Sequence, residues 1–399
     1  MEEQATGPLK GLVVLDASTV IGGPMAASLL GEYGASVIKI EHPVYGDGAR
    51  QAGTTKAARG LWWKFLSRNK KCVTLDLSHV DGAEVFKRLV ERADVVIENF
   101  RPGTMERWGL GPDELMEVNE RLVMLRVTGF GQDGPYAGRP GYGTIAEAMS
   151  GFAHMTGDPM GPPTLPGVPL ADGAAGMAGA AAIMFAIWSR DSGCNRGKGE
   201  VIDLSLYNPL LYMLGLYIAE YDASKVSPTR RGNRFGQAPR NARQCLDGRW
   251  IAYAAMTPSM LDRIVDLLDL GSDPRFEIRG TALEHGEELD ALLGSWVESR
   301  RSSDAVDTLV DIGIPATYVN DAQGIIEDLH VQARGDIVNV PDEDYGTLAM
   351  PIGPVRFRDQ PGSIRTTGGS KGGDNQQILG EWLGLTSDEM ERLEKQLTI

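Results

Sequence analysis

Short apolar runs alternate with amphipathic segments along the first half of the chain. The runs at residues 12–16, 37–41, 72–77, 94–98 and 121–127 are rich in valine, isoleucine and leucine, as buried strands are. The segments between them carry apolar residues at helical spacing. Strands that alternate with helices of this length predict βαβ units around a mostly parallel sheet. We therefore expect an α/β fold whose large domain is Rossmann-like.

The composition of the sequence changes after residue 223, where a polar, basic and turn-rich stretch begins. Beyond this stretch, residues 244–253 predict a hairpin around Asp247 and Gly248, and three helical patterns follow. These elements predict a smaller α+β domain that is inserted into the large one. The expected organisation is the N-terminal part of the large Rossmann-like domain at 1–223, a linker at 224–239, the small domain at 240–330 and a return segment at 331–399 that completes the large domain.

Composition excludes several classes of partner. The 399 residues include 39 Lys and Arg against 54 Asp and Glu, which gives a net charge of −15. Nonspecific binding to nucleic acid or to an anionic membrane requires a basic surface, so neither partner is expected. The longest apolar run, residues 174–188, is shorter than the roughly 20 residues that a membrane span needs. The chain opens with acidic residues instead of a signal region, and we expect a cytoplasmic protein.

The sequence predicts neither a metal site nor the functions of two short motifs that it contains. The three cysteines are far apart and the five histidines have no ligand spacing, so no metal site is expected. Residues 129–134 match GxGxxG, but prolines and glycines follow where a dinucleotide site needs a helix. Residues 368–372 match GxSxG without the preceding strand that a nucleophile elbow needs.

Asp172 is the most informative single residue, because it stands just before the long apolar run in the segment GVPLADGAAG. Aspartate is a preferred N-cap residue, so Asp172 can simply satisfy the first amides of a buried helix. A helix N-terminus also stabilises an ionised carboxylate, and the small neighbours leave room for a ligand. Such a carboxylate can attack an acyl carbon. The residues alone leave the capping and the catalytic interpretation open.

Several long blocks of the sequence resemble class III CoA-transferases, the family of formyl-CoA and carnitine-CoA transferases. The blocks include LKGLVVLDASTVIGGPMAASLLGEYGASVIKIEHP, DVVIENFRPGTMERWGLG, VTGFGQDGPYAGRPGYG and GVPLADGAAG, and later RNARQCLDGRWIAY, GIPATYVND and MPIGPVRF. They occur in the order and spacing of the family and extend from about residue 9 to residue 383. Blocks of this length are far more specific than a lone motif.

The resemblance implies roles for individual residues. It assigns the nucleophile to Asp172, the aspartate of the GxPxxDxxxG block. It assigns the CoA pocket to Val20, Ile21, Gly22, His42, Leu75, Asn99, Phe100, Arg101, Arg107, Arg139 and Tyr142. It further implies an interlocked, ring-like homodimer with a Rossmann-like large domain.

The resemblance also implies a reaction. CoA moves from an acyl-CoA, with succinyl-CoA as a candidate, to a carboxylic acid through an aspartyl anhydride and an aspartyl-CoA thioester. CoA and acyl-CoA are then substrates, and no tightly bound cofactor is expected. Some positions depart from the family pattern: His42 stands where arginine is frequent, Ile21 where some members have glutamine, and residues 254–256 where the formyl-CoA enzymes have a glycine run. We therefore expect an acyl group that is bulkier or less polar than oxalate.

Two alternatives accompany this hypothesis. α-Methylacyl-CoA racemases are similar over the same span but use a histidine and an aspartate as a proton-transferring pair. Their histidine lies in the block that corresponds to residues 139–143, which contains none here. The other alternative is a noncatalytic CoA-binding protein, against which the intact block around Asp172 argues.

Overall fold

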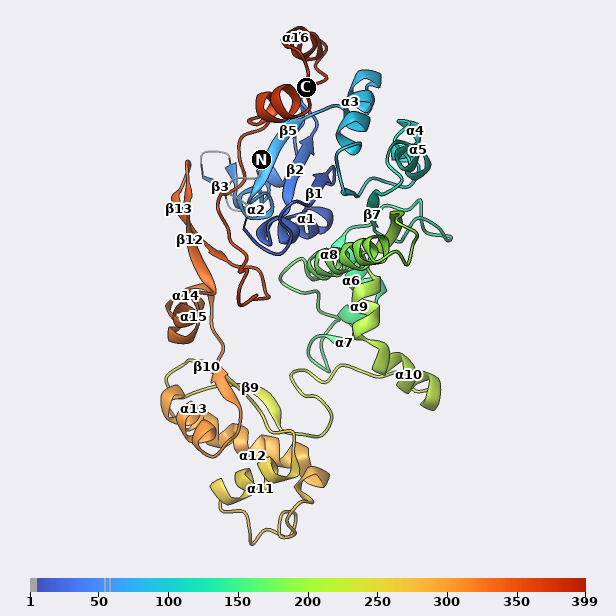
Figure 1. The fold of residues 1–399 in the computed structure, drawn as a ribbon. Helices are drawn as coiled ribbons and strands as arrows, with labels where there is room; N and C mark the ends of the chain where they lie inside the picture. The colour runs from blue at the N-terminus through green and yellow to red at the C-terminus, as the bar shows by residue number, and fades with distance from the viewer. Residues whose placement is uncertain (1–5, 54, 57–58) are drawn as a thin grey trace. The chain divides into compact units, whose positions relative to one another are not determined.

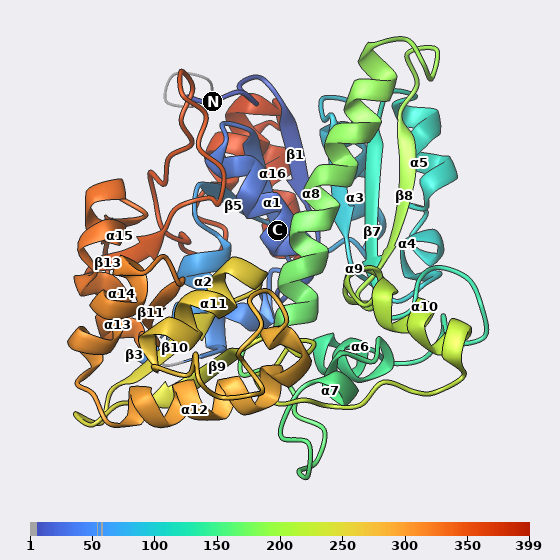
Figure 2. The same cartoon turned by 90° about the horizontal axis from the view of Figure 1, so that it is seen from below.

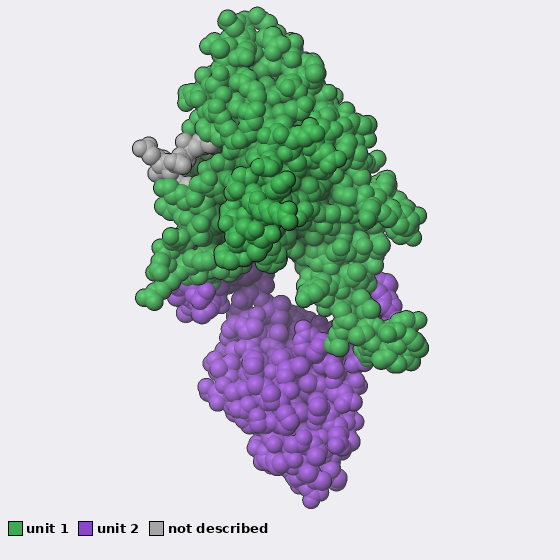
Figure 3. Space-filling view, turned by 45° about the vertical axis from the view of Figure 1, so that its right-hand side comes forward, with its two compact units in different colours: residues 1–152, 165–226, 335–399 green, residues 153–164, 227–334 purple. Residues whose placement is uncertain are grey.

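The computed structural model describes residues 6–53, 55–56 and 59–399. They form two compact units, described separately below (Figure 3). Unit 1 comprises residues 6–53, 55–56, 59–152, 165–226 and 335–399, and unit 2 comprises residues 153–164 and 227–334.

Unit 1 is built on a six-stranded sheet in the order β5-β2-β1-β6-β7-β8, with every neighbouring pair parallel (Figure 1). The strands are β1 (Val13–Asp16), β2 (Ser36–Glu41), β5 (Lys70–Thr74), β6 (Val95–Glu98), β7 (Val123–Thr128) and β8 (Glu200–Ser205). The predicted α/β fold with a parallel sheet is therefore confirmed. Counted along the chain, the order is 3-2-1-4-5-6, that of a doubly wound Rossmann-type sheet. The order reverses between β1 and β6, and ligands of such sheets bind in the crevice at the carboxyl ends of those strands.

Helices cover both faces of this sheet (Figure 2). Side chains alternate along each strand, so that Val14 packs into one hydrophobic core and Leu15 into the other. One face is covered by α1 (Gly22–Glu32), α8 (Leu170–Asp191) and α9 (Asn208–Met213), and the other by α3 (Val80–Val90), α4 (Thr104–Arg107) and α5 (Pro112–Val118). The strands have nearly continuous apolar sequences because both faces are buried.

Helix α8 carries the long apolar run and lies against α1 and the sheet. Of the helices in the described part of the chain, it alone is long and apolar enough to cross a membrane, and half of its most apolar window is buried. Its small residues allow a close approach to α1: a Cβ added at Gly176 would lie 2.6 Å from Met25 Cβ and 3.1 Å from the Gly22 carbonyl oxygen. The approach brings the first turns of α1 and α8 together.

The return segment after residue 334 joins unit 1 at two places. It begins with the hairpin β12 (Ile337–Asp342) and β13 (Gly346–Pro351) and ends with a π-helix at Gln376–Trp382 and α16 (Ser387–Lys395). The two last helices add apolar residues to one core of the sheet. Just before them, Asp374 accepts a hydrogen bond from the Cys72 amide (2.7 Å) and Asn375 one from the Thr74 amide (2.9 Å). These side chains cover the free edge of β5.

The described residues of unit 1 form six further elements in addition to the sheet, the helices that cover it and the return segment. They are a 3₁₀ turn η1 (Gly48–Gln51), β3 (Thr55–Lys56), β4 (Arg59–Gly60), α2 (Leu61–Leu66), α6 (Gly143–Met149) and α10 (Gly215–Ser224).

Unit 2 is an α+β unit around a three-stranded antiparallel sheet in the order β11-β10-β9. Strands β9 (Arg240–Gln244) and β10 (Trp250–Ala254) form the predicted hairpin, with Asp247 and Gly248 in its turn. The other elements are α11 (Pro258–Leu267), a 3₁₀ turn (Ala282–His285), α12 (Gly286–Glu298), α13 (Ser302–Asp311), β11 (Ala316–Tyr318), α14 (Ala322–Glu327) and α15 (Leu329–Arg334). A short helix, α7 (Phe152–Met155), lies at the boundary of the two units in sequence.

Candidate active site

A cavity of about 550 Å³ opens at the carboxyl ends of β1, β6 and β7 in unit 1. This is where a doubly wound sheet binds its ligands, and the volume is typical of small-molecule sites. The wall comes from the loops after these three strands and from the beginnings of α6 and α8. The lining residues are 19–22, 99–102, 127–129, 137, 139–144, 147, 165–169, 172 and 206.

Nine of the twelve site residues predicted from the sequence line this one cavity. They are Val20, Ile21, Gly22, Asn99, Phe100, Arg101, Arg139, Tyr142 and Asp172. These residues come from four separate segments of the chain, and the topology of the sheet brings them together.

The other three predicted residues lie outside the cavity wall. His42 follows β2 and lies 3.7 Å from the Asp76 carboxylate, with its Nδ1 accepting a hydrogen bond from the Val44 amide. Leu75 directly follows β5, and its side chain is buried in the core on the face of the sheet covered by α3. Arg107 is exposed on α4 and donates a hydrogen bond to Thr104 Oγ1 at 2.9 Å.

Asp172 is not the N-cap residue of α8, so the prediction of an N-cap aspartate is wrong. The helix begins at Leu170 with Pro169 as its N-cap residue, which places Asp172 inside the first turn. The capping function passes instead to Glu147 of α6, whose Oε1 accepts a hydrogen bond from the Ala171 amide at 3.3 Å. The Asp172 carboxylate is therefore available on the cavity wall.

Two glycines make the space that the Asp172 carboxylate occupies. A Cβ added at Gly143 would lie only 2.1 Å from Asp172 Oδ2, and one added at Gly22 would lie 3.4 Å from Oδ1. A side chain at position 143 would therefore displace the carboxylate. The backbone of Gly22, at the start of α1, therefore lies beside the carboxylate, and its amide lowers the pKa of Asp172.

The environment of Asp172 raises its pKa from 3.8 to about 6. Burial is the largest cause, and the negative charge of Glu147 adds to it. Hydrogen bonds from the backbone amides of Asp172 itself and of Gly22 act in the opposite direction. At neutral pH the carboxylate is thus ionised but poorly solvated, which suits a nucleophile.

Positive charge reaches the cavity from two exposed arginines. Arg101 follows β6, and Arg139 lies in the loop between β7 and α6. The guanidinium of Arg139 stacks on the ring of Tyr136, 3.6 Å from its centroid, which restricts its orientation. Guanidinium groups at a cavity wall are suited to the phosphates of a ligand such as CoA.

Of the GxGxxG segment at residues 129–134, Gly129 lines the cavity, and the segment does not form a dinucleotide motif. After β7 the chain continues as a loop, and the next helix begins only at Gly143, as predicted. A Cβ at Gly129 would lie 2.7 Å from the Gly141 Cα, so the two ends of the loop meet closely. The loop lets residues 139–144 return to the cavity.

Sequence reasoning missed Glu147 and Gly143. Glu147 is almost fully buried, yet in sequence it is one polar residue within the short segment GTIAEAMS. An acidic residue on an otherwise apolar helix was the available signal. Gly143 gave no signal of its own, because the need for a glycine there arises from contact with α8.

Comparison with known proteins places the chain in a family. Residues 9–375 match the sequence profile of CoA-transferase family III. The beta subunit of succinyl-CoA–L-malate CoA-transferase from Chloroflexus aurantiacus is 38% identical, over 99% of this chain and 98% of that protein. Succinyl-CoA–D-citramalate CoA-transferase from the same organism is 36% identical, over 98% of each.

Structural comparison agrees with the sequence. A crystal structure of a CaiB/BaiF family protein from Brucella suis superposes with a TM-score of 0.82 at 30% identity, and the match covers 94% of this chain and 99% of that one. The chain therefore belongs to CoA-transferase family III, and the family predicted from the sequence blocks is confirmed. It is a CoA-transferase whose cavity holds an ionisable aspartate.

We expect Asp172→Asn to stabilise the fold at pH 7.5 but hardly at pH 4. The unfolded carboxyl titrates near 3.8 and the folded one near 6, so stability falls as pH rises through that window. A rise of about two pKa units corresponds to roughly 3 kcal/mol at pH 7.5. Urea unfolding at both pH values measures the gain, and an equal gain at both would contradict the raised pKa.

We expect Glu147→Gln to reduce the gain that Asp172→Asn gives at pH 7.5. Removing the negative charge of Glu147 lowers the pKa of Asp172, while glutamine can still accept the Ala171 hydrogen bond. The measurement compares the Asp172→Asn gain in the two backgrounds. Glu117→Gln, the same substitution at an exposed position of α5, is the control and leaves the gain unchanged.

Proposed function

We propose that this CoA-transferase moves CoA from succinyl-CoA to a carboxylic acid, with Asp172 as the nucleophile. The observation that carries the proposal is the Asp172 carboxylate itself. It lies on the wall of the cavity at the carboxyl ends of β1, β6 and β7, and its pKa is raised. The names of the relatives support the donor, since the two Chloroflexus proteins are succinyl-CoA transferases for L-malate and D-citramalate. The acceptor is a small carboxylic acid of this kind.

The proposed reaction exchanges acyl groups without ATP. The Asp172 carboxylate attacks the thioester carbonyl, and CoA leaves as a thiolate, which gives a mixed anhydride. The thiolate attacks the aspartyl carbonyl and expels succinate, which leaves an aspartyl-CoA thioester. The acceptor carboxylate then attacks this thioester and releases the thiolate, which attacks the acceptor acyl carbon and frees Asp172. Each intermediate keeps the carbonyl of Asp172 activated, as an anhydride or a thioester, so a series of easier acyl transfers replaces one difficult exchange.

The other cavity residues serve orientation in this proposal. The phosphates of CoA lie toward Arg101 and Arg139, and the acyl end lies toward Asp172. Binding energy from the remote part of CoA then holds the thioester carbonyl near the carboxylate. The Gly22 amide, beside the carboxylate, is a donor for the oxyanions that form during attack.

The isomerase alternative has less support in the site. A proton-transferring pair needs a second base across the substrate, and no histidine is among the described residues that line the cavity. Glu147 is near Asp172, but its Oε1 already accepts the Ala171 amide. A noncatalytic role fits poorly with a carboxylate kept poorly solvated on the cavity wall.

We expect inactivation by hydroxylamine to depend on the acyl-CoA donor. With succinyl-CoA and no acceptor, an acyl-aspartyl or aspartyl-CoA species accumulates, and hydroxylamine attacks such activated acyl groups but not a free carboxylate. Mass spectrometry then finds the modification on Asp172. Asp172→Ala abolishes both the transfer and the inactivation while the protein still binds CoA.

Two results would contradict the nucleophile. One is substantial turnover by folded Asp172→Ala. The other is exchange of the α-proton of a 2-methylacyl-CoA with solvent without donor-dependent inactivation, which favours the isomerase. A panel of L-malate, citramalate, glutarate and oxalate as acceptors, with mass spectrometry of the CoA esters, identifies the acceptor.

We expect the protein to be an obligate homodimer with interlocked subunits. Helix α10 has no buried residue although it contains Leu216, and Phe185 and Trp188 of α8 are 72% and 73% exposed. Aromatic side chains that are this exposed are typical of a covered interface. Sedimentation at low micromolar concentration measures the assembly, and Trp188→Glu weakens it. A fully active monomer, or activity that requires a different second chain, would contradict the homodimer.

A further inference from the structure

The turn before α1 contains a strained residue at the cavity wall. Val20 has a φ of 69°, in the left-handed region that β-branched residues rarely adopt. Such a conformation is unfavourable for a β-branched residue and persists only where surrounding contacts fix it. Val20 is two residues before Gly22, where an added Cβ would lie 3.4 Å from Asp172 Oδ1 and whose amide lowers the pKa of Asp172. The contacts that fix Val20 therefore also bear on the nucleophile.

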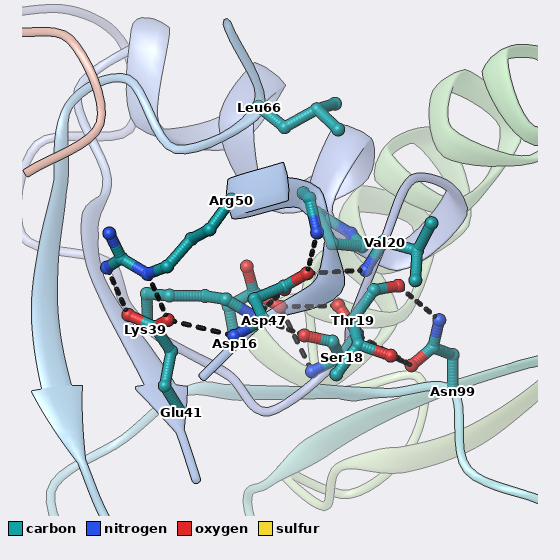
Figure 4. Close-up of polar contacts among 12 residues, drawn as sticks. Asp16, Ser18, Thr19, Val20, Lys39, Glu41, Asp47, Arg50, Leu66 and Asn99 are labelled. Atoms are coloured by element: carbon teal, nitrogen blue, oxygen red, sulfur yellow. Dashed lines mark hydrogen bonds and ion pairs between the residues drawn. The ribbon is translucent and has the colours of Figure 1, made fainter. Parts of the chain in front are cut away.

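Asp47 provides one of these contacts from a distant part of the chain (Figure 4). Its Oδ1 accepts hydrogen bonds from the Val20 amide at 3.1 Å and from the Ala49 amide at 2.8 Å. Its Oδ2 pairs with Lys39 Nζ at 3.0 Å, and both side chains are nearly fully buried. The carboxylate is thus fully engaged between the turn and β2.

Neighbouring groups complete the clamp around the turn. Asn99 holds the residue before Val20 from the other side, since its Oδ1 accepts from the Thr19 amide and its Nδ2 donates to the Thr19 carbonyl, both at 2.7 Å. Lys39 also donates to the Ser18 carbonyl. Glu41 accepts a hydrogen bond from the Asp47 amide at 3.1 Å, which fixes Asp47 in turn.

We propose that Asp47 is a positioning residue for the Asp172 nucleophile, because it holds Val20 in the left-handed conformation that directs the Gly22 amide at the Asp172 carboxylate. Asp47 is not among the residues that line the cavity. Its effect passes through the backbone of residues 20–22. The inference rests on the proposed function for its kinetic readout only.

If the contacts that hold Val20 are lost, the pKa of Asp172 should rise, and this shift can be measured. When Val20 relaxes, the Gly22 amide withdraws and the pKa of Asp172 rises further, since that amide lowers it. Among the charged and titratable groups of the cavity, Glu147 acts on Asp172 from α6, and Arg101, Arg139 and Tyr142 lie on the same wall. None of these groups is altered by a substitution at Asp47.

The first test is Asp47→Asn, which keeps the size of the side chain. Asparagine can accept from the Val20 amide through its Oδ1 only if its Nδ2 group faces the Lys39 ammonium, where two donors oppose each other, so the two contacts cannot both persist. We expect the acid limb of the pH profile of kcat/KM for CoA transfer to move to higher pH by up to about one pH unit. This is the effect of losing one hydrogen bond to a charged group. An unmoved limb overturns the proposal.

The second test is Val20→Gly, because glycine adopts a φ near 69° without strain and needs no clamp. Combined with Asp47→Asn, it should return the acid limb to within a few tenths of a unit of Val20→Gly alone. A limb that stays displaced in the double variant overturns the proposal, since Asp47 would then act by another route. The comparison is a double-mutant cycle and separates the coupling from each single effect.

Asp342→Asn is the matched control. Asp342 is also a buried carboxylate paired with a lysine, Lys64 at 2.8 Å, and it lies outside the cavity wall. We expect it to lower the melting temperature and to leave the acid limb in place. If Asp47→Asn behaves in the same way, its role is structural and the proposal fails.

A readout without turnover keeps this test separate from the proposed function. The gain in stability from Asp172→Asn at pH 7.5 reports the pKa of Asp172 directly, and it should increase in the Asp47→Asn background and return with Val20→Gly. If the protein transfers no CoA but this pattern holds, the proposed function fails and the positioning role of Asp47 stands. If the gain is unchanged, the positioning role fails.

Discussion

The site depends on the close contact between the first turns of α1 and α8. Gly176 lets the two helices approach, so that the Gly22 amide and the Asp172 carboxylate meet although 150 residues separate them. Helix α1 comes after β1 in the chain, whereas α8 comes between β7 and β8. The strand order reverses between β1 and β6, which opens the crevice at the carboxyl ends of these strands. A bulkier residue at the contact would separate the carboxylate from its donor, whatever the rest of the cavity offered.

The site is also a place where the fold accepts unfavourable terms. Asp172 is ionised against the opposition of burial and of Glu147, and Val20 adopts a strained backbone conformation. Other parts of the fold must offset these two unfavourable contributions to stability. The sheet does so, because each of its two faces packs against an apolar core. The buried lysine and aspartate below the turn hold the conformation and do not replace that packing.

The fold could be predicted from the sequence because its strands have a simple signature. Runs such as residues 94–98 are apolar at every position, as strands buried on both faces must be, and they marked the parallel sheet. Asp172 was found through its long surrounding block, but its place in the helix was not. Proximity to an apolar run does not show where a helix begins, and Pro169 set that start instead. Asp47 and Glu147 were missed, because their roles lie in contacts with residues 24 to 27 positions away; only Glu147, an acidic residue in an apolar segment, gave a sign in the sequence.

The cover that the return segment places on β5 has a consequence for how the chain reaches its native state. Until Asp374 and Asn375 have been synthesised, the amides of Cys72 and Thr74 remain an open strand edge, ready to pair with another chain. The large unit therefore cannot close as the chain emerges, and its contacts span about 300 residues. Such long-range closure makes folding slow and leaves a period in which aggregation competes with it. The edge of β5 is thus protected from pairing with another chain only after the C-terminal segment has been made and has docked.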